Sequence, residues 1–535
     1  MVKLTIDNRE VTVEPGATLL DAARTAGIDV PTLCYCEGLR PNTTCMVCVV
    51  KVRNGAAGKL VPACATRAAE GMIVESESAE VRLARKTSLE LLLSDHAAEC
   101  HAPCQFADPF DTDIPRMIRA VAADRLDAAI VILRDEMPLA GILTHVVRET
   151  CEGGCRRCAI DEAAAIGLLK RYVTDKDRAA ATQYVPPRAT TTGQRAAIVG
   201  SGPAGLTAAY FLVRFGHDCT VFEQSGEIGE SLRGRLGREL PSEILDAEIE
   251  LLKKMGVDFE TGQEIDCSGS RVSADVCPPP RCPPTADPAG RTFADLRKSF
   301  DAVLIATGKA EQRVSANSTT HATDTPGVFA AGDVVRAQAD AARAAADGKA
   351  AAFCVDQYLR GVAISGREKL FALGTGRPSN EEIASLMIDT DASPRVTPTE
   401  PNGDLSDEQA RLEARRCLHC DCRSLETCKL RLYAERYGAE AKRFKGARRP
   451  MERIVTHPEI VYEPGKCIVC GICVQITEQL RDALGLTYIG RGFDVRVAVP
   501  FDERLDAALR NAARRCVENC PTGALAWRTE RAFHT

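Results

Sequence analysis

The sequence has no apolar run of the ~18 residues that a transmembrane helix requires. The apolar stretch 128–133, for example, is ended by three charged residues, Arg134, Asp135 and Glu136. The first ten residues, MVKLTIDNRE, read as a strand and not as a secretory signal peptide. These absences predict a cytoplasmic protein with no membrane span.

Several catalytic motifs are also missing. The chain contains no GxSxG, no HExxH and no Walker loop, so hydrolytic and group-transfer sites of these kinds are not expected. The net charge is −6 and the isoelectric point is near 5.9, which argues against a surface for nucleic acid or an anionic membrane. Bound cofactors are therefore expected to carry the chemistry.

Cysteine, by contrast, is abundant and clustered. The 535 residues include 24 cysteines, ten of them before residue 195 and nine after residue 400. Because disulfides are rare in the cytoplasm, short runs of cysteines predict metal sites. A chain of this length should hold several domains of roughly 100–200 residues each.

A dinucleotide-binding unit is predicted at residues 195–223. A short apolar run enters a glycine-rich turn, a helical pattern follows, and a second β-rich run ends on an acidic residue. Glycines in such a turn let the backbone approach a pyrophosphate at a helix N-terminus, and the acid can accept a hydrogen bond from a ribose hydroxyl. The predicted cofactor-binding residues here are Gly200, Gly202, Pro203, Ala204, Gly205 and Glu223.

The first cysteine set lies near the N-terminus, after a predicted hairpin and a short helix capped by Thr18. Its members, spaced C-x10-C-x2-C-x15-C, are Cys34, Cys45, Cys48 and Cys64. Four thiolates can hold a [2Fe–2S] cluster, whereas zinc loops favour two close pairs. The set resembles the plant-type ferredoxin module that opens the large iron–sulfur subunit of complex I and of related formate dehydrogenases and iron hydrogenases.

A second group begins with the words LLLSDHAAEC, which resemble the same complex I subunit and its [4Fe–4S] site of one histidine and three cysteines. From there CHAPCQ, MPLAG and CEGGC resemble the helical domain of the glutamate synthase small subunit and dihydropyrimidine dehydrogenase, which holds two [4Fe–4S] clusters. Asp108 stands where that family has a further cysteine, so one cluster is expected here. Its predicted ligands are His96, Cys100, Cys104 and Cys155, with Cys151 or Cys158 as alternatives to His96.

The central region continues this resemblance. The stretch 234–259 and the motifs DAVLIATG and TPGVFAAGD are similar to the flavin domain of the glutamate synthase family. The resemblance implies that Gly332 and Asp333 contact the flavin ribityl–phosphate region, and it favours FAD over NAD at the Gly200 turn. Family members insert a second glycine fingerprint for NADPH, but residues 309–331 contain none. The proline-rich stretch 277–284 is predicted to be a stiff connector.

Two further sets lie after residue 400. The first, C-x2-C-x-C-x5-C, is expected to bind iron–sulfur in preference to zinc and comprises Cys417, Cys420, Cys422 and Cys428. The second is the bacterial ferredoxin run, which comprises Cys467, Cys470, Cys473 and Cys520 and leaves Cys516 without a predicted role. The words GRGFDVRVAVPFD and CPTGAL again resemble the complex I subunit.

These features predict a multidomain protein of α/β and α+β class. The expected domains are a β-grasp [2Fe–2S] ferredoxin at 1–80, a helical [4Fe–4S] domain at 81–190, a truncated Rossmann-like FAD domain at 191–365, a linker and cysteine-rich helical segment at 366–445, and a bacterial-ferredoxin-like [4Fe–4S] domain at 446–535. The expected cofactors are FAD, one [2Fe–2S] cluster and three [4Fe–4S] clusters.

The resemblances imply an electron-transfer subunit of an oxidoreductase complex. Its implied partners are a diaphorase-like NAD/flavin module and a catalytic subunit of the formate dehydrogenase or hydrogenase type. One alternative is a self-sufficient NAD(P)H oxidoreductase like the glutamate synthase small subunit. The other is a metal-stabilised scaffold or redox sensor.

Overall fold

The structure is a computed structural model that describes residues 1–54, 57–146, 149–236, 241–265, 291–308, 313–337, 340–399, 403–444 and 446–528. The chain forms two compact units. The first unit consists of Met1–Ala102, Phe371–Ala392 and Leu418–Thr535, and the second of Pro103–Leu370 and Ser393–Cys417. The first unit is therefore assembled from three separate stretches of sequence.

The first unit begins with a mixed five-stranded sheet of order β2-β1-β5-β3-β4, in which only β1 and β5 pair in parallel. The strands are β1 (Val2–Ile6), β2 (Arg9–Val13), β3 (Val49–Asn54), β4 (Ala57–Pro62) and β5 (Ile73–Glu75). Helix α1 (Leu19–Thr25) covers the sheet's apolar face and starts at Thr18. The Thr18 hydroxyl accepts from the Asp21 amide, and the Asp21 carboxylate accepts from the Thr18 amide, which is a capping box.

The remainder of the first unit is mainly helical. It contains α2 (Ala79–Ser94), α13 (Asn380–Met387), α15 (Lys429–Tyr437), α16 (Ile472–Gln479), α17 (Leu505–Ala508) and α18 (Ala513–Asn519), with the antiparallel strand pairs β11 (Ile460–Tyr462) and β14 (Leu525–Trp527), and β12 (Thr487–Ile489) and β13 (Arg496–Ala498). One hydrophobic core joins these elements to the N-terminal loop, through residues such as Leu33, Leu89, Leu430 and Ile476. Segments far apart in sequence thus share a single core.

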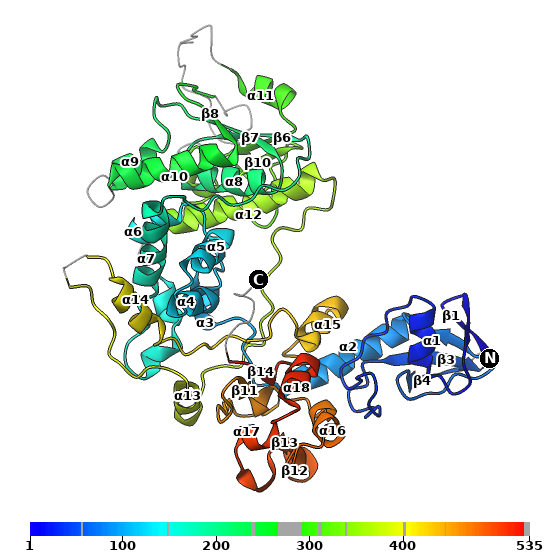
Figure 1. The fold of residues 1–535 in the computed structure, drawn as a ribbon. Coiled ribbons are helices and arrows are strands. Elements are labelled where there is room, and N and C mark those ends of the chain that lie inside the picture. Colours follow the sequence, from blue (N-terminus) through cyan, green and yellow to red (C-terminus); the bar gives the residue numbers. More distant parts are fainter. Residues whose placement is uncertain are drawn as a thin grey trace. The chain divides into compact units, whose positions relative to one another are not determined.

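The second unit is built on a five-stranded sheet of order β10-β9-β6-β7-β8, all parallel. The strands are β6 (Arg195–Val199), β7 (Asp218–Phe222), β8 (Val257–Glu260), β9 (Ala302–Ile305) and β10 (Val328–Ala330). Around the sheet lie α8 (Pro203–Arg214), α9 (Glu230–Leu236), α10 (Ser242–Met255), α11 (Phe293–Ser299) and α12 (Ala341–Leu359), as Figure 1 shows. Because β6, α8 and β7 follow one another as a βαβ unit, the α8 N-terminus opens at the carboxyl ends of the strands.

Helices preceding the sheet complete the second unit. They are α3 (Pro103–Ala107), α4 (Ile114–Ala122), α5 (Leu126–Glu136), α6 (Ala140–Val146), the short 3-10 helices η1 (Cys151–Gly154) and η2 (Arg156–Ala159), and α7 (Ile166–Ala179), joined by α14 (Asp407–Ala414). A buried fork ties them to the sheet region: the Arg134 guanidinium donates to both Glu248 oxygens of α10 at 3.1 Å. A fully buried arginine paired in this way fixes the two parts in register.

Between β9 and β10 the described residues, 306–308 and 313–327, form no strand apart from a single bridge at Ala322. The described part of this connection thus contains no second nucleotide-binding sheet. The 277–284 connector lies outside the described residues. Within the described part of the chain, no helix is long and apolar enough to span a membrane.

Candidate functional site

The glycine turn after β6 is as tight as the fingerprint requires. Gly200 has φ of +109°, and a Cβ there would lie 2.4 Å from the Ala306 carbonyl oxygen. A Cβ on Gly205 would lie 2.0 Å from the Gly200 oxygen. Gly202 is the extended residue that precedes α8, and Pro203 is its first residue. Only glycine fits at Gly200 and at Gly205. With no side chains at these positions, the turn leaves backbone N–H groups at the helix N-terminus open toward a ligand.

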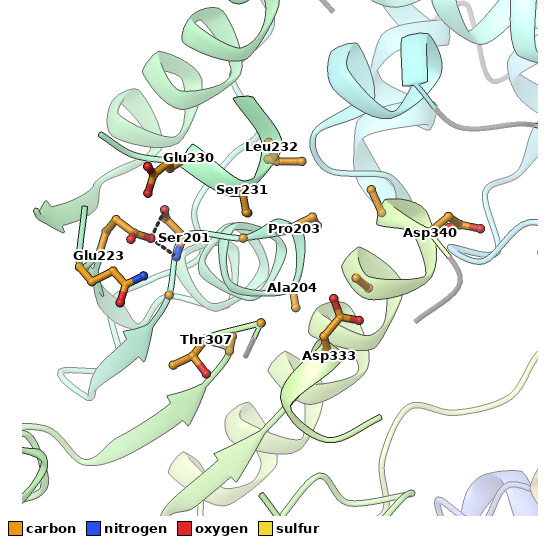
Figure 2. Close-up of a pocket in the computed structure, with 18 of the residues that line it drawn as sticks. Ser201, Pro203, Ala204, Glu223, Glu230, Ser231, Leu232, Thr307, Asp333 and Asp340 are labelled. Carbon is orange, nitrogen blue, oxygen red and sulfur yellow. Dashed lines mark hydrogen bonds between the residues drawn. The ribbon is translucent and has the colours of Figure 1, made fainter. Parts of the chain in front are cut away.

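A cavity of about 390 Å³ opens above this turn, a size typical of small-molecule sites. Figure 2 shows the α8 start, the α9 residues and the α12 start around it. Its lining includes all but one of the predicted cofactor-binding residues, namely Gly200, Gly202, Pro203, Ala204, Glu223, Gly332 and Asp333. Gly205 lies one turn into α8 and supports the site by packing.

Glu223 is held rigidly at the end of β7. One of its carboxylate oxygens accepts from the Ser201 amide at 3.0 Å and the Ser201 hydroxyl at 2.5 Å, and the other accepts from the Ser225 amide at 3.0 Å. Burial alone would raise the pKa of Glu223, but these hydrogen bonds outweigh it and hold the pKa below its usual value. Glu223 is therefore an ionised acceptor at neutral pH.

The cavity lining carries a surplus of acid. Besides Glu223 it includes Glu230, Asp333 and Asp340, and no lysine or arginine is among the described residues that line it. Such a site repels an adenosine 2′-phosphate and accepts a 2′-hydroxyl. A 2′-hydroxyl nucleotide, such as FAD or NAD, fits this arrangement better than NADP.

Two supporting residues were missed by the sequence analysis, and both lie on α12. The Asp347 carboxylate accepts from the Gly332 amide at 2.6 Å, which fixes the turn next to Asp333. A Cβ on Gly348 would lie 2.1 Å from the Ala204 carbonyl oxygen, so α12 rests directly on the first turn of α8. The available signal was an isolated glycine within an alanine-rich helical pattern, which often marks close packing.

The N-terminal thiols converge as a set of four. Cys34, Cys45, Cys48 and Cys64 are all buried, and the Cys34 and Cys45 sulfurs lie 3.3 Å apart. The thiol–thiol hydrogen bonds of the Cys34–Cys45 and Cys48–Cys64 pairs lower the pKa of Cys34 to about 5 and that of Cys48 to about 7, and they raise the pKa of Cys45 and of Cys64. Four buried thiols gathered in this way suit a [2Fe–2S] cluster, which four cysteines bind as thiolates.

The C-terminal ferredoxin run also converges. Burial and the charges of the neighbouring Cys467, Cys470 and Cys520 raise the pKa of Cys473. Amide groups point at two of the sulfurs: Val469 donates to Cys467 at 3.4 Å, and Leu525 donates to Cys520 at 3.5 Å. Amide-to-sulfur bonds of this kind are features of iron–sulfur sites. Cys516 is fully buried beside the set.

Cys100 lies beside Cys422 and Cys428, a neighbourhood that the sequence analysis did not predict. The Cys422 amide donates to the Cys100 carbonyl at 3.3 Å. Burial and the charges of Cys422 and Cys428 raise the pKa of Cys100, and burial raises that of Cys428 to about 12. The Lys466 ammonium interacts with Cys422, Cys100 and His96. Two thiols and one histidine therefore share a cationic neighbour.

His96 is suited to act as a neutral ligand. It is 7% exposed, and burial together with the nearby Lys466 and Arg449 charges lowers its pKa to about 3. Its imidazole is therefore unprotonated at neutral pH, which metal binding requires. A lowered pKa alone does not make a ligand, so its role stays a prediction.

The remaining thiols gather within the second unit. A Cβ on Gly154 would lie 3.2 Å from the Cys104 Cα, so the segment before Cys155 packs against Cys104. The Arg157 guanidinium donates to the Arg416 carbonyl at 2.6 Å and so anchors the residue before Cys417 next to the Cys155 segment. Cys158 is exposed, and Cys151 lies in a network of carboxylates and a lysine.

Two of the predicted sets are divided between the units. His96 and Cys100 belong to the first unit, whereas Cys104 and Cys155 belong to the second. Likewise Cys417 belongs to the second unit, and Cys420, Cys422 and Cys428 to the first. Both groupings therefore remain predictions.

Three families match parts of the chain. A family described as "2Fe-2S iron-sulfur cluster binding domain" matches residues 1–79. One described as "Dihydropyrimidine dehydrogenase domain II, 4Fe-4S cluster" matches residues 77–182. One described as "NAD(P)-binding Rossmann-like domain" matches residues 198–246. The predicted [2Fe–2S], [4Fe–4S] and Rossmann-like domain types are thus confirmed, although the last match does not separate FAD from NAD(P).

Several relatives are subunits of oxidoreductases. The chain is 34% identical over 229 residues to the NADP(+)-dependent formate dehydrogenase subunit beta of Moorella thermoacetica, covering 39% of this chain and 29% of that protein. It is 35% identical over 170 residues to the NAD-dependent dihydropyrimidine dehydrogenase subunit PreT of Escherichia coli O157:H7, covering 31% and 41%. It is 32% identical over 213 residues to the NADPH-Fe(3+) oxidoreductase subunit beta of Geobacter sulfurreducens, covering 39% and 28%.

These alignments confirm the predicted resemblance to formate dehydrogenase subunits and to the dihydropyrimidine dehydrogenase type of helical domain. They span only 28 to 41% of the lengths of these relatives. A crystal structure of an NAD+-reducing [NiFe]-hydrogenase aligns with 98% of this chain and 87% of its own at 12% identity and a TM-score of 0.35, which is too low to support an argument.

Proposed function

We propose that this chain is an iron–sulfur flavoprotein subunit that transfers electrons within a cytoplasmic oxidoreductase complex. The observation that supports this most strongly is the placement of two complete thiol sets in one compact unit, Cys34 with its three partners and Cys470 with its three. Hydrolytic chemistry needs no such sets. Electron transfer does, because each cluster carries one electron at a potential that the protein sets.

FAD is the proposed ligand of the Gly200 turn. The acidic lining disfavours a 2′-phosphate, and Glu223 offers a ribose acceptor. Asp333 lies on the turn that Asp347 fixes, in reach of the cavity. FAD, when bound, exchanges two electrons with a hydride donor or acceptor and single electrons with iron–sulfur clusters. The chain's own residues bind the pyrophosphate with backbone amides, orient the ribose, and shield the site between α8, α9 and α12.

The proposed [4Fe–4S] ligands follow the observed neighbourhoods. One centre takes His96, Cys100, Cys422 and Cys428. Lys466 is a neighbour of the first three, and Cys428 is a neighbour of Cys100 and Cys422. A second takes Cys104, Cys155 and Cys417, all of the second unit; the Gly154 and Arg157 contacts support it. The third takes Cys467, Cys470, Cys473 and Cys520. With the [2Fe–2S] set, the proposed content is about 14 iron atoms per chain.

The proposed partners are protein subunits. The relatives named above are subunits of formate, dihydropyrimidine and ferric-iron oxidoreductases. A chain with a flavin site but no second nucleotide-binding sheet among its described residues needs an electron donor or acceptor elsewhere. The proposed donor and acceptor are a diaphorase-like NAD/flavin module and a catalytic subunit that is formate dehydrogenase-like or hydrogenase-like.

The purified chain alone is expected to contain FAD and to leave it oxidised when NADH or NADPH is added without oxygen. Hydride transfer requires the nicotinamide to be held against the flavin ring, and no element of the described residues provides a second pyrophosphate site. The measurement is identification of the released flavin, followed by anaerobic absorption spectra after mixing with each nucleotide at micromolar concentration.

The other functions give different results in the same experiment. Bleaching of the flavin within seconds would favour a self-sufficient NAD(P)H oxidoreductase. A colourless chain that contains zinc would favour a scaffold or sensor, because zinc sites do not absorb visible light. A brown chain without flavin would retain the iron–sulfur part of the proposal and remove FAD from it.

A further inference from the structure

The loop between Cys34 and Cys45 contacts the helix that follows Cys470, within the first unit. The Asn42 side-chain amide donates to the Cys470 carbonyl at 2.6 Å. Gln475, on α16, donates to the Asn42 side-chain oxygen at 3.2 Å and pairs with the Arg40 backbone through two hydrogen bonds of 3.0 Å. This contact joins the N-terminal thiol set to the C-terminal one.

The residue after Cys470 leaves room for this contact. Gly471, next in sequence, has φ of +74°, and a Cβ there would lie 2.4 Å from the Asn42 amide nitrogen and 1.9 Å from the Tyr488 hydroxyl. Any larger residue would push Asn42 away. Gly471 thus allows the amide to reach the peptide of Cys470.

We propose that Asn42 is a positioning residue for electron transfer between the two centres. This inference rests on the proposed function. In such a transfer one electron would pass from one cluster to the other, and no proton or bond would be exchanged. By fixing the Cys470 peptide against the Cys34–Cys45 loop, Asn42 sets the separation on which the transfer rate depends.

The test compares Asn42→Ala and Asn42→Asp with a surface control, Asn511→Ala, in the full chain with its clusters. Asn42→Asp keeps the shape but removes the N–H donor. Both Asn42 variants are expected to keep wild-type iron content, to reduce the magnetic splitting between the two centres in electron paramagnetic resonance, and to slow the inter-centre electron transfer, because its rate falls as the separation of the centres grows. Asn511→Ala should match the wild type.

Splitting and rate unchanged in both Asn42 variants would overturn the inference while leaving the proposed function intact. A wild-type chain that lacks either centre would instead overturn the proposed function and this inference together. If Asn42→Ala loses iron, Asn42→Asp carries the comparison. If both Asn42 variants lose the same amount of iron while Asn511→Ala keeps its iron, Asn42 supports folding and not electron transfer. That result would also contradict the proposal.

A second inference comes from a different, buried cluster in the second unit. Lys170 of α7 places its ammonium 2.7 Å from Asp108, 2.9 Å from Glu149 and 3.3 Å from the Cys151 sulfur. The Cys151 thiol donates to Glu149 at 2.7 Å. The Lys170 and Asp108 side chains are each 1% exposed. Asp108, Glu149 and Cys151 each offer one possible metal-ligand atom, and these three atoms lie within 4.8 Å of one another. At this spacing they could share one metal ion.

This donor set does not fit the [4Fe–4S] cluster for which the matching family is named, because it offers a single thiol. It also already holds a cation. An ammonium at 2.7 and 2.9 Å from two carboxylates neutralises one of their two negative charges, and a metal ion could enter only if Lys170 left a fully buried position. We infer that the Lys170 ammonium permanently occupies the cation position among Asp108, Glu149 and Cys151, and that these three side chains bind no metal ion.

The test measures metal on the chain with its clusters assembled. Wild type and Lys170→Arg are expected to bind no Cd²⁺ at Cys151, whereas Lys170→Ala is expected to gain about one Cd²⁺ with a thiolate-to-metal absorption band. That band should vanish in Lys170→Ala combined with Cys151→Ser. Cys151→Ser alone should keep the wild-type iron and sulfide content.

Loss of iron in Cys151→Ser, or Cd²⁺ binding at Cys151 in the wild type, would overturn this inference. Failure of Lys170→Ala to gain Cd²⁺ would also count against it, because it would show that the ammonium is not what excludes the metal. Should Lys170→Ala not fold, the Cys151→Ser iron content and the wild-type Cd²⁺ titration still decide the question.

Discussion

The Gly348→Ala variant is expected to lose its flavin and keep all of its iron. The added methyl group would lie 2.1 Å from the Ala204 oxygen and 2.7 Å from the Ala204 carbonyl carbon, which are backbone atoms that cannot rotate away. Relief requires α12 to move off α8, and the loop fixed by Asp347 moves with it. Overpacking of this kind costs about 3 kcal/mol, or roughly 100-fold in flavin affinity.

Gly226→Ala is the matched control, because Gly226 lies near the same site with open space around its Cα and no positive φ. It should bind flavin as the wild type does. Flavin content per chain, measured by absorption after denaturation, and iron content, measured by chelation, report the two outcomes. Retained flavin in Gly348→Ala would show that the cavity does not depend on the contact between α12 and α8.

The second large effect is expected from Cys422→Ser, which should lose about four iron atoms per chain, the content of one [4Fe–4S] cluster. Cys422 is buried next to Cys100 and Cys428, and a serine hydroxyl is a poor substitute for a thiolate ligand. One low-temperature paramagnetic signal should disappear, and the [2Fe–2S] signal should persist because its ligands lie elsewhere.

Cys158→Ser provides the comparison, since Cys158 is exposed and its thiol donates to the Glu152 carbonyl at 3.5 Å. This variant is expected to keep its iron. If it instead loses as much iron as Cys422→Ser, Cys158 is itself a ligand of the second-unit centre. Unchanged iron in Cys422→Ser would contradict the proposed grouping with Cys100.

Local motifs were well predicted by the sequence. The Thr18 cap involves residues within one helical turn, and the structure has this cap as expected. The glycine turn and Glu223 belong to one βαβ unit, residues 195–223, and the structure forms its two strands and its helix. The ferredoxin run was likewise predicted, because three of its cysteines lie within seven consecutive residues. Backbone geometry over short distances is what sequence patterns encode most directly.

Long-range pairings were harder to predict. The resemblance of CHAPCQ to a known helical domain grouped Cys100 with Cys104, four residues away, and this grouping stays a prediction. It gave no sign that Cys100 also neighbours Cys422 and Cys428, more than three hundred residues later. Gly348 was missed for a related reason: its necessity arises from Ala204 on another helix. Only tertiary packing reveals which distant segments meet, and no periodicity in the sequence carries that information.

The first unit is assembled from three separate stretches of sequence, and this has a consequence for biosynthesis. The ligands of the N-terminal thiol set are all contained in residues 34–64, so this centre can be assembled while translation continues. Cys100, however, must wait for residues 422 and 428, which at about 5–20 residues per second takes tens of seconds. During that time the whole second unit is made and can fold. With the proposed ligand sets, cluster insertion would therefore have a built-in order, with the earliest centre at the N-terminus and the Cys100 centre among the last.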